Sequence, residues 1–288
     1  MAVELGRVLF GQLGGLRFQP TQKRVRATVD GDAVVDSARA VLVWEPRRIV
    51  PQYAVPADDI SAELVPAPPS TEAAAPLDAI GSRKVLSPGH FRTHTTEGEE
   101  LTVRAPAGER EAAAFRLADP DLAGYVELDF AAFDQWLEED EPIVSHPRDP
   151  FHRVDVRRSS RSVVVEHEGT VLAESARTRR LFETSLPART YFSPEDVRFD
   201  QLLPSDTETA CAYKGRTSSY WAVERADGRR VDVAWSYEHP LPDAAELAGL
   251  VAFFDERVDV VVDGERRERP ITPWTLPSPP TRGSARSR

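Results

Sequence analysis

The chain has 288 residues, of which 41% are hydrophobic and 29% charged, and its formal net charge at pH 7 is −11. This composition is typical of a folded protein long enough for two domains, and the acidic balance disfavours wrapping of nucleic acid because phosphate is repelled. No apolar run reaches the roughly 20 residues of a membrane helix, the N-terminal stretch lacks a secretory-signal pattern, and the single cysteine, Cys211, excludes an internal disulfide. We therefore expect a cytoplasmic protein without a membrane or nucleic-acid partner.

An internal repeat begins near the N-terminus. Residues 24–66 align with residues 162–204 without a gap, at an offset of 138 positions. The coinciding positions include turn, charged and aromatic residues: Gly31 with Gly169, Arg39 with Arg177, Glu45 with Glu183, Tyr53 with Tyr191, and Pro56 with Pro194. We predict two tandem copies of one domain, a divergent copy over residues 1–145 and a more complete copy over residues 163–270, joined by a linker over residues 146–162.

Four segments have distinctive compositions. Residues 66–76 (PAPPSTEAAAP) are a Pro/Ala-rich insertion that we expect to be mobile. Residues 146–153 (HPRDPFHR) predict either a polar hinge or a ligand cleft at a domain interface. The basic stretch over residues 153–161 (RVDVRRSSR) reads as a solvated linker, and residues 271–288 as a disordered tail.

The second copy reads as short strands separated by turns. Glu168-Gly169, residues 193–196 and Asp227-Gly228 are typical turn sequences, and Asp243 with Glu246 predicts a capping box that opens a short helix, which Gly249 can close. The strands are expected at residues 163–165, 171–172, 179–183, 189–192, 220–224, 231–237, 251–254 and 258–262. The pattern predicts a mainly β fold, a small barrel or sandwich with short helices, in each copy.

Side chains alternate between the two faces of a strand, and this sorts the aromatic residues of the second copy. By this count the apolar faces of three successive strands carry Thr209, Cys211 and Tyr213, then Trp221 and Val223, then Val231, Val233, Trp235 and Tyr237. We expect these faces to meet inside the domain. Buried tyrosine and tryptophan need partners for their polar groups, so the interior is either a hydrogen-bonded core or a pocket that holds a ligand.

Lys214 and Gly215 follow Tyr213 at a turn. An ammonium group at the mouth of an aromatic pocket suits a carboxylate or phosphate, and glycine lets backbone N–H groups turn toward an anion; the alternative is a hairpin lysine in water. Cys211 is either a nucleophile or an inert buried thiol. The six histidines show no paired spacing of metal ligands, so we expect no metal.

Glu45 and Glu183 recur in both copies, as do Arg39 and Arg177. A structural ion pair between these glutamates and arginines explains the recurrence as well as a functional site does.

Several stretches resemble the domain-of-unknown-function family 427 in its tandem form: SARTRRLFET, RTYFSPEDV, TACAYKGRTSSYW, DVAWSYEHPLPDAAELAGLVAFF and RVDVVVDG. The resemblance covers most of residues 163–264, with a divergent copy over residues 24–140. It implies a compact β fold of the tent type, similar to methionine-sulfoxide-reductase-B and cereblon ligand-binding domains, whose metal-binding cysteines are absent here. The family is sometimes catalogued as nucleotidyltransferase-like, but the sequence does not supply the paired metal-binding carboxylates of that chemistry.

The family pattern maps onto the second copy at Glu183, Tyr191, Asp196, Asp206, Cys211, Tyr213, Lys214, Gly215, Trp235 and Tyr237. In the first copy GHFRTH (residues 89–94) stands where CAYKG is expected, so the resemblance implies that its pocket is altered or lost.

We expect the second copy to bind a small anionic or aromatic ligand through Tyr191, Tyr213, Lys214, Gly215, Trp221, Trp235, Tyr237 and Asp206. One alternative is an enzyme in which Cys211 or Lys214 reacts while Glu183 or Asp206 handles protons. Another is an interaction scaffold without a small ligand. No cofactor is expected, and the oligomeric state is left open.

Overall fold

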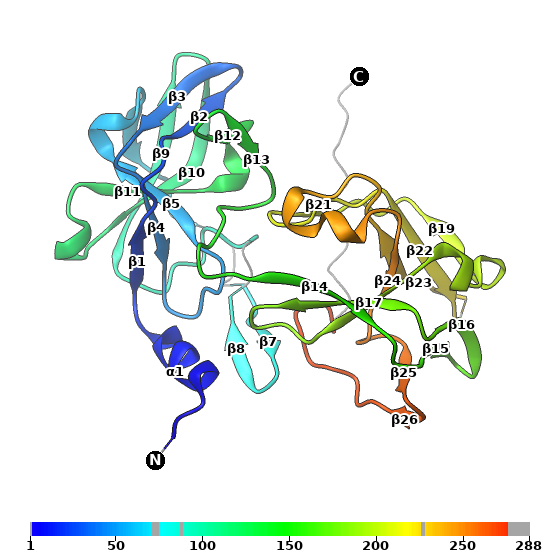
Figure 1. The fold of residues 1–288 in the computed structure, drawn as a ribbon. Coiled ribbons are helices and arrows are strands. Elements are labelled where there is room, and N and C mark those ends of the chain that lie inside the picture. The colour runs from blue at the N-terminus through cyan, green and yellow to red at the C-terminus, as the bar shows by residue number, and fades with distance from the viewer. Residues whose placement is uncertain (1, 71–74, 87–88, 226–227, 276–288) are drawn as a thin grey trace. The chain divides into compact units, whose positions relative to one another are not determined.

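The computed structural model describes residues 2–70, 75–86, 89–225 and 228–275, and Figure 1 shows the course of the chain. The chain forms two compact units. Unit 1 consists of Met1–Asp78, Lys84–His152 and Thr209–Arg216, and unit 2 consists of Ala79–Arg83, Arg153–Glu208 and Thr217–Arg288. Each unit therefore includes a short segment that the sequence alone assigns to the other copy.

The first copy builds two antiparallel sheets (Figure 1). Its seven-stranded sheet runs in the order β1 (Arg17–Pro20), β4 (Val41–Trp44), β5 (Gln52–Pro56), β11 (Tyr125–Leu128), β10 (Gly108–Leu117), β9 (Gly98–Ala105) and β6 (Glu63–Pro66). Its four-stranded sheet runs in the order β13 (Glu141–Ile143), β12 (Gln135–Glu138), β2 (Val25–Val29) and β3 (Asp32–Ser37). The short helical elements are α1 (Leu5–Gly11), η1 (Gln12–Gly14), η2 (Ala57–Asp59), η3 (Pro120–Leu122) and η4 (Phe130–Ala132), and β7 (Asp78–Ile80) and β8 (Arg83–Val85) form a hairpin.

The second copy repeats this topology strand for strand. Its seven-stranded sheet runs in the order β14 (Val154–Ser159), β17 (Thr178–Glu183), β18 (Arg189–Phe192), β24 (Val251–Phe253), β23 (Arg230–Ser236), β22 (Ser219–Glu224) and β19 (Leu203–Ser205). Its four-stranded sheet runs in the order β16 (Thr170–Ser175), β15 (Val163–His167), β25 (Asp259–Val262) and β26 (Glu265–Arg266). The remaining elements are η5 (Pro194–Asp196), η6 (Phe199–Gln201), η7 (Pro242–Leu247) and the hairpin of β20 (Ala210–Cys211) with β21 (Gly215–Arg216). The prediction of a duplicated, mainly β fold is therefore confirmed.

Tight turns fix the register of the first hairpin in each copy. Asp30 and Gly31 both have positive φ, at 49° and 90°, and Glu168 and Gly169 have φ of 49° and 83°. Two consecutive residues in this region match a two-residue hairpin turn whose twist fits the flanking strands. The Gly31 and Gly169 positions of the sequence repeat are thus explained by turn geometry.

Each seven-stranded sheet buries residues on both faces. In unit 1 the inner core includes Leu42, Trp44, Tyr53 and Trp136, whereas Val41, Val43, Ala54 and Phe115 form an outer cluster. In unit 2 the inner core includes Phe192, Val233, Phe253 and Val260, and the outer cluster includes Tyr191, Tyr220, Trp235 and Tyr237. Alternating residues of one strand supply the two layers, because successive side chains point to opposite faces.

The gap-free alignment of the two copies is wrong at the third strand of each seven-stranded sheet, β5 in the first copy and β18 in the second. Leu42 pairs with Tyr53 in the first copy, whereas Arg180, its counterpart, pairs with Thr190. The preceding loop is one residue shorter in the second copy, so Tyr191 occupies the place of Ala54. Because a one-residue slip turns a side chain to the other face, Tyr53 lies in the inner core and Tyr191 in the outer cluster.

Other local predictions are corrected. Val154–Ser159, expected in the linker, form β14 and pair along their whole length with β17. The helix η7 begins at Pro242 without a side-chain cap, so the capping box is wrong. Thr272, expected in a disordered tail, is buried, and its hydroxyl donates to Glu256 at 2.8 Å. Residues 71–74 of the insertion, Asp227 of the predicted turn, and residues 276–288 lie outside the described residues.

No helix in the described part of the chain combines the length and the apolar character that a membrane span requires.

Candidate functional site

A β-bulge separates the aromatic residues that the sequence placed on one face. Trp221 lies opposite Ala234, and the next residue, Ala222, lies opposite Asp232, so Val233 is an extra residue in β23. Trp221 packs on the inner core, whereas Trp235 and Tyr237 belong to the outer cluster. The prediction that these apolar faces meet is therefore wrong, because a bulge inverts the alternation beyond it.

The outer cluster of unit 2 is densely packed around Trp235. The Trp235 ring lies 4.3 Å from the Phe254 ring, centroid to centroid, and makes an edge contact with Tyr191 at 6.4 Å. The Arg189 guanidinium lies 5.5 Å from the Trp235 ring and forms a bidentate ion pair with Glu256, at 3.1 and 2.9 Å. Tyr191, Trp235 and Tyr237 are all less than a tenth exposed. Among the described residues, the outer cluster is therefore tightly packed with side chains.

The CAYKG hairpin groups with unit 1. The N–H of Asp149 donates to the Tyr213 hydroxyl at 2.7 Å, and the His152 ring stacks on the Tyr213 ring at 4.1 Å. Burial raises the pKa of the Tyr213 phenol. The HPRDPFHR stretch, expected as a hinge or cleft, thus supplies the surroundings of Tyr213.

The other predicted site residues are placed as follows. Lys214 and Gly215 are buried, and Gly215 adopts a φ of 93° that suits glycine. Cys211 is half-buried, and its sulfur accepts the N–H of Tyr213 at 3.5 Å. Glu183 is half-buried in unit 2, and Asp206 is exposed there. A reaction of Cys211 or Lys214, with Glu183 or Asp206 handling protons, stays a prediction.

The expected pairing of Glu45 with Arg39 is wrong. Arg39 pairs instead with Asp59, at 2.5 Å, and its counterpart Arg177 pairs with Glu195, at 3.5 Å. Glu45 accepts hydrogen bonds from Arg48 Nε at 3.1 Å and from the Thr95 N–H at 2.6 Å, and it lies 3.1 Å from His94 Nδ1.

Counted back along the sequence from equivalent strand positions, His94 of the first copy corresponds to Lys214 of the second. Pro66 of the first copy pairs with Leu101, and its counterpart Pro204 pairs with Trp221. His94 lies seven residues before Leu101, and Lys214 lies seven residues before Trp221. The His94 ring stacks on the Phe115 ring at 3.5 Å. That the pocket of the first copy is altered or lost stays a prediction.

Glu45 and Glu127 carry opposite pKa shifts in this buried cluster. Burial alone would raise the pKa of Glu45, but His94, Arg48 and the Thr95 N–H outweigh it, so the pKa is lowered. Burial and the negative charge of Glu45 raise the pKa of Glu127 well above its usual value. Neither carboxyl oxygen of Glu127 has a hydrogen-bond partner among the described residues. A buried carboxyl group with a raised pKa thus lies in the field of one with a lowered pKa, an arrangement that the sequence analysis missed.

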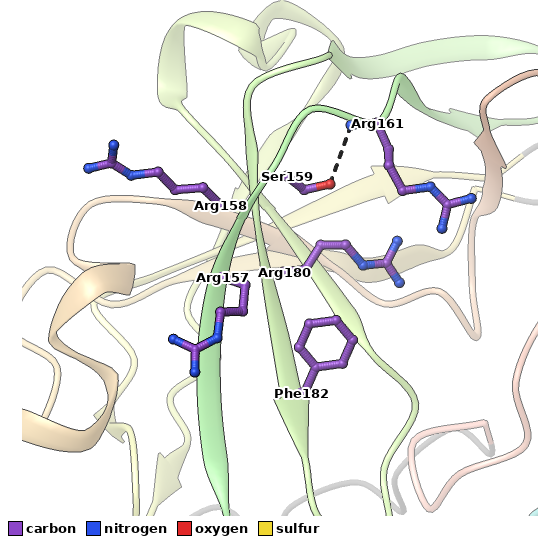
Figure 2. Close-up of a pocket in the computed structure, with 6 residues that line it drawn as sticks. All are labelled: Arg157, Arg158, Ser159, Arg161, Arg180 and Phe182. Carbon is purple, nitrogen blue, oxygen red and sulfur yellow. Dashed lines mark hydrogen bonds between the residues drawn. The ribbon is translucent and has the colours of Figure 1, made fainter.

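Unit 2 carries a second arrangement of charged residues, at the edge of its large sheet (Figure 2). An open hollow of about 260 Å³ is lined by Arg157, Arg158, Ser159, Arg161, Arg180 and Phe182. We call it the arginine hollow. Figure 2 shows Arg161 and Arg180 extending to the same side, with the Phe182 ring beside Arg180, whereas Arg157 and Arg158 extend to the other side.

Strand pairing places arginines at directly opposite backbone positions along this edge, although their side chains extend to different sides. Arg157 lies directly opposite Arg180, and Arg158 lies directly opposite Arg179. Like charges opposite one another destabilise a sheet, so packing alone does not account for this arrangement. Asp155 pairs with Arg157 at 2.8 Å and Asp263 pairs with Arg161 at 2.7 Å.

Arg180 is the least compensated of these cations. Burial lowers the pKa of its guanidinium, and the positive charges of Arg161 and Arg267 lower it further, against the opposing charges of Asp255 and Asp263. Within the described residues Arg180 forms no ion pair; its nearest described partner is the Phe182 ring, 5.9 Å from its central carbon. A bound anion would stabilise the protonated Arg180.

The sequence model of one protein family, named NTP_transf_9 and described as a domain of unknown function (DUF427), matches residues 17–76 and 155–264. These two segments cover more than half of the chain and fall on the two structural copies. The chain belongs to the DUF427 family. No curated protein matches it significantly.

The arginine hollow distinguishes the second DUF427 segment from the first. At the positions of Arg180 and Phe182, the first segment has Leu42 and Trp44, both in its inner core. Tyr53 lies opposite Leu42 and stacks on Trp136 at 5.1 Å. In the second segment the smaller Thr190 pairs with Arg180, as Tyr53 pairs with Leu42 in the first. The smaller Val260 likewise pairs with Val165, as Trp136 pairs with Ala27. One DUF427 copy thus fills this edge with rings, and the other lines it with cations.

Proposed function

We propose that the second copy is a binding module for a small organic anion, held in the arginine hollow. The observation that carries the proposal is Arg180, a partly buried cation of the hollow that lies in the field of Arg161 without an ion-pair partner among the described residues. Charge-assisted hydrogen bonds from guanidinium groups to an oxyanion are stronger than neutral ones and often bidentate.

Comparison of the two copies supports the same function. In the first copy the equivalent positions are apolar and belong to the inner core, so the fold does not require arginine there. An uncompensated cation that costs stability, at a position where the same fold accepts leucine, is expected where charge serves recognition. The proposal keeps the small anionic ligand predicted from the sequence but places it away from Lys214 and Trp235.

Isothermal titration of the full chain with inorganic pyrophosphate tests the proposal. We expect binding that weakens as salt is raised, because the partners are charged. The variants Arg180→Gln and Arg161→Gln should each weaken binding about tenfold or more, since each removes a charge-assisted contact. The matched control is Arg177→Gln, an arginine of the same unit that is 80% exposed. Equal binding by wild type and both hollow variants would refute the proposal.

A further inference from the structure

The arginine hollow has two chemically different ends. Arg161 lies at one end and the half-buried Phe182 ring at the other, with Arg180 between them, its central carbon 5.9 Å from the Phe182 ring. Asp155 lies directly opposite Phe182 across the strand pair, where its carboxylate pairs with Arg153 and Arg157. At the other end Asp263 already pairs with Arg161 at 2.7 Å. An anionic group is therefore favoured at Arg180, which has no ion-pair partner among the described residues, rather than beside Phe182 and Asp155, so a ligand would be held in one orientation.

The cationic end favours a doubly charged oxyanion. Two guanidinium groups lie near one another there, and the positive charges of Arg161 and Arg267 act on Arg180 against the negative charges of Asp255 and Asp263. Ser159 Oγ accepts the Arg161 N–H at 3.3 Å, which leaves the hydroxyl proton able to donate. A phosphate monoester carries about −1.5 to −2 charges at pH 7 and offers three strong acceptor oxygens. A carboxylate offers one charge and two oxygens.

The other end favours a planar ring. The Phe182 side chain is not covered by the inner core, unlike Trp44 at the equivalent position of the first copy. A half-buried phenyl ring beside guanidinium groups is a combination on which nucleobases stack in proteins that bind nucleotides and single strands. The volume of about 260 Å³ limits the occupant to a small molecule, and the net charge of −11 opposes a polyanionic strand.

We infer that the ligand of the arginine hollow is a nucleoside monophosphate, with its phosphate held by Arg161 and Arg180 and its base stacked on Phe182. This inference rests on the proposed function, because it names the ligand class of the same site.

The test is calorimetric titration of the full chain with inorganic phosphate, adenosine 5′-monophosphate and adenosine. We expect the monophosphate to bind about tenfold more tightly than phosphate, since stacking on one aromatic side chain is worth roughly this factor or more, and adenosine to give no measurable binding. Phe182→Leu should reduce the affinity for the monophosphate to that for phosphate and leave phosphate binding unchanged. Arg161→Gln should weaken both, and Arg177→Gln should weaken neither.

Titration at two pH values identifies the charged group. The second pKa of a phosphate monoester is near 6, so affinity for the monophosphate should fall several-fold from pH 7.5 to pH 5.0, whereas affinity for benzoate should be constant over that range. Equal affinity for phosphate and the monophosphate would overturn this inference and leave the proposed function standing. Tighter binding of a short single-stranded oligonucleotide than of the monophosphate would also overturn it. Binding of none of these anions would overturn both.

Discussion

Arg180→Leu should stabilise unit 2 while abolishing anion binding. The substitution installs the residue that the first copy has at this position, Leu42, which is 2% exposed. It removes the repulsion of Arg180 by Arg161 and Arg267, worth roughly 0.2–1 kcal/mol, and the desolvation of a guanidinium. It also removes the contact with Phe182, worth about 0.5 kcal/mol at an exposed site. Because a leucine can bury additional apolar surface here, we expect a net gain of about 0.5–1 kcal/mol.

Hydrogen exchange followed by mass spectrometry measures this gain within the full chain, through the slowest amides of β17 and β18. The electrostatic part should shrink as salt is raised from 0.1 to 1 M, because the screening length falls from about 10 to 3 Å. The control Arg177→Leu should change the free energy of unfolding by less than about 0.5 kcal/mol. A less stable Arg180→Leu protein at low salt, or a gain that does not depend on salt, would refute the assignment of Arg180 to binding rather than to packing.

Three further substitutions test the buried polar groups by urea unfolding and hydrogen exchange. Because the pKa of Glu127 is raised in the folded state, its contribution to stability is complete below its unfolded pKa and is lost as pH rises toward its folded pKa. Glu127→Gln should therefore stabilise unit 1 more at pH 8 than at pH 5. An equal effect at both pH values would contradict the shift. Tyr53→Phe removes a 2.8 Å hydrogen bond from the buried hydroxyl to the Glu138 carboxylate and should cost roughly 1.5–3 kcal/mol in unit 1; no loss would show that the bond adds nothing. Glu256→Gln removes one of the two carboxylate partners of Arg189, the other being Asp255 at 3.3 Å, and should cost roughly 1.5–3 kcal/mol in unit 2. Since the Glu256 pKa is lowered, the wild type should lose this advantage as pH falls through the folded pKa, and a wild type that keeps it at low pH would argue against the shift.

The sequence predicted most of the fold because the relevant signals are local. Turn residues such as Asp30 and Gly31 require positive φ, and alternating apolar residues mark the strands. The predictions failed where a single residue changes the count. One loop residue fewer before β18 moved Tyr191 to the outer cluster, and one extra residue at Val233 moved Trp235 there. Neither change alters composition or periodicity enough to be seen without strand pairing.

The candidate site was harder to predict because its members are distant in sequence. The basic stretch that contains Arg157 and Arg161 was visible but read as a solvated linker, and only the pairing of β14 with β17 brings Arg180 and Phe182 beside it. Glu127 had one local signal, an acidic residue inside the apolar strand sequence YVEL. Its burial beside Glu45 depends on tertiary contacts that no local pattern specifies.

The discontinuity of unit 1 limits how the gene can be divided. Thr209–Arg216 belongs with the N-terminal copy, so a truncation product ending at residue 152 would lack Tyr213, and with it the ring that stacks on His152 and the hydroxyl that accepts the Asp149 N–H. A protein expressed from residue 153 onward would carry the same eight residues without those neighbours. Dissection of this chain into single copies should therefore yield fragments less stable than either copy in the intact polypeptide. A variant that keeps every segment of one unit, with Thr209–Arg216 joined to the N-terminal copy, is the better route to isolating unit 1.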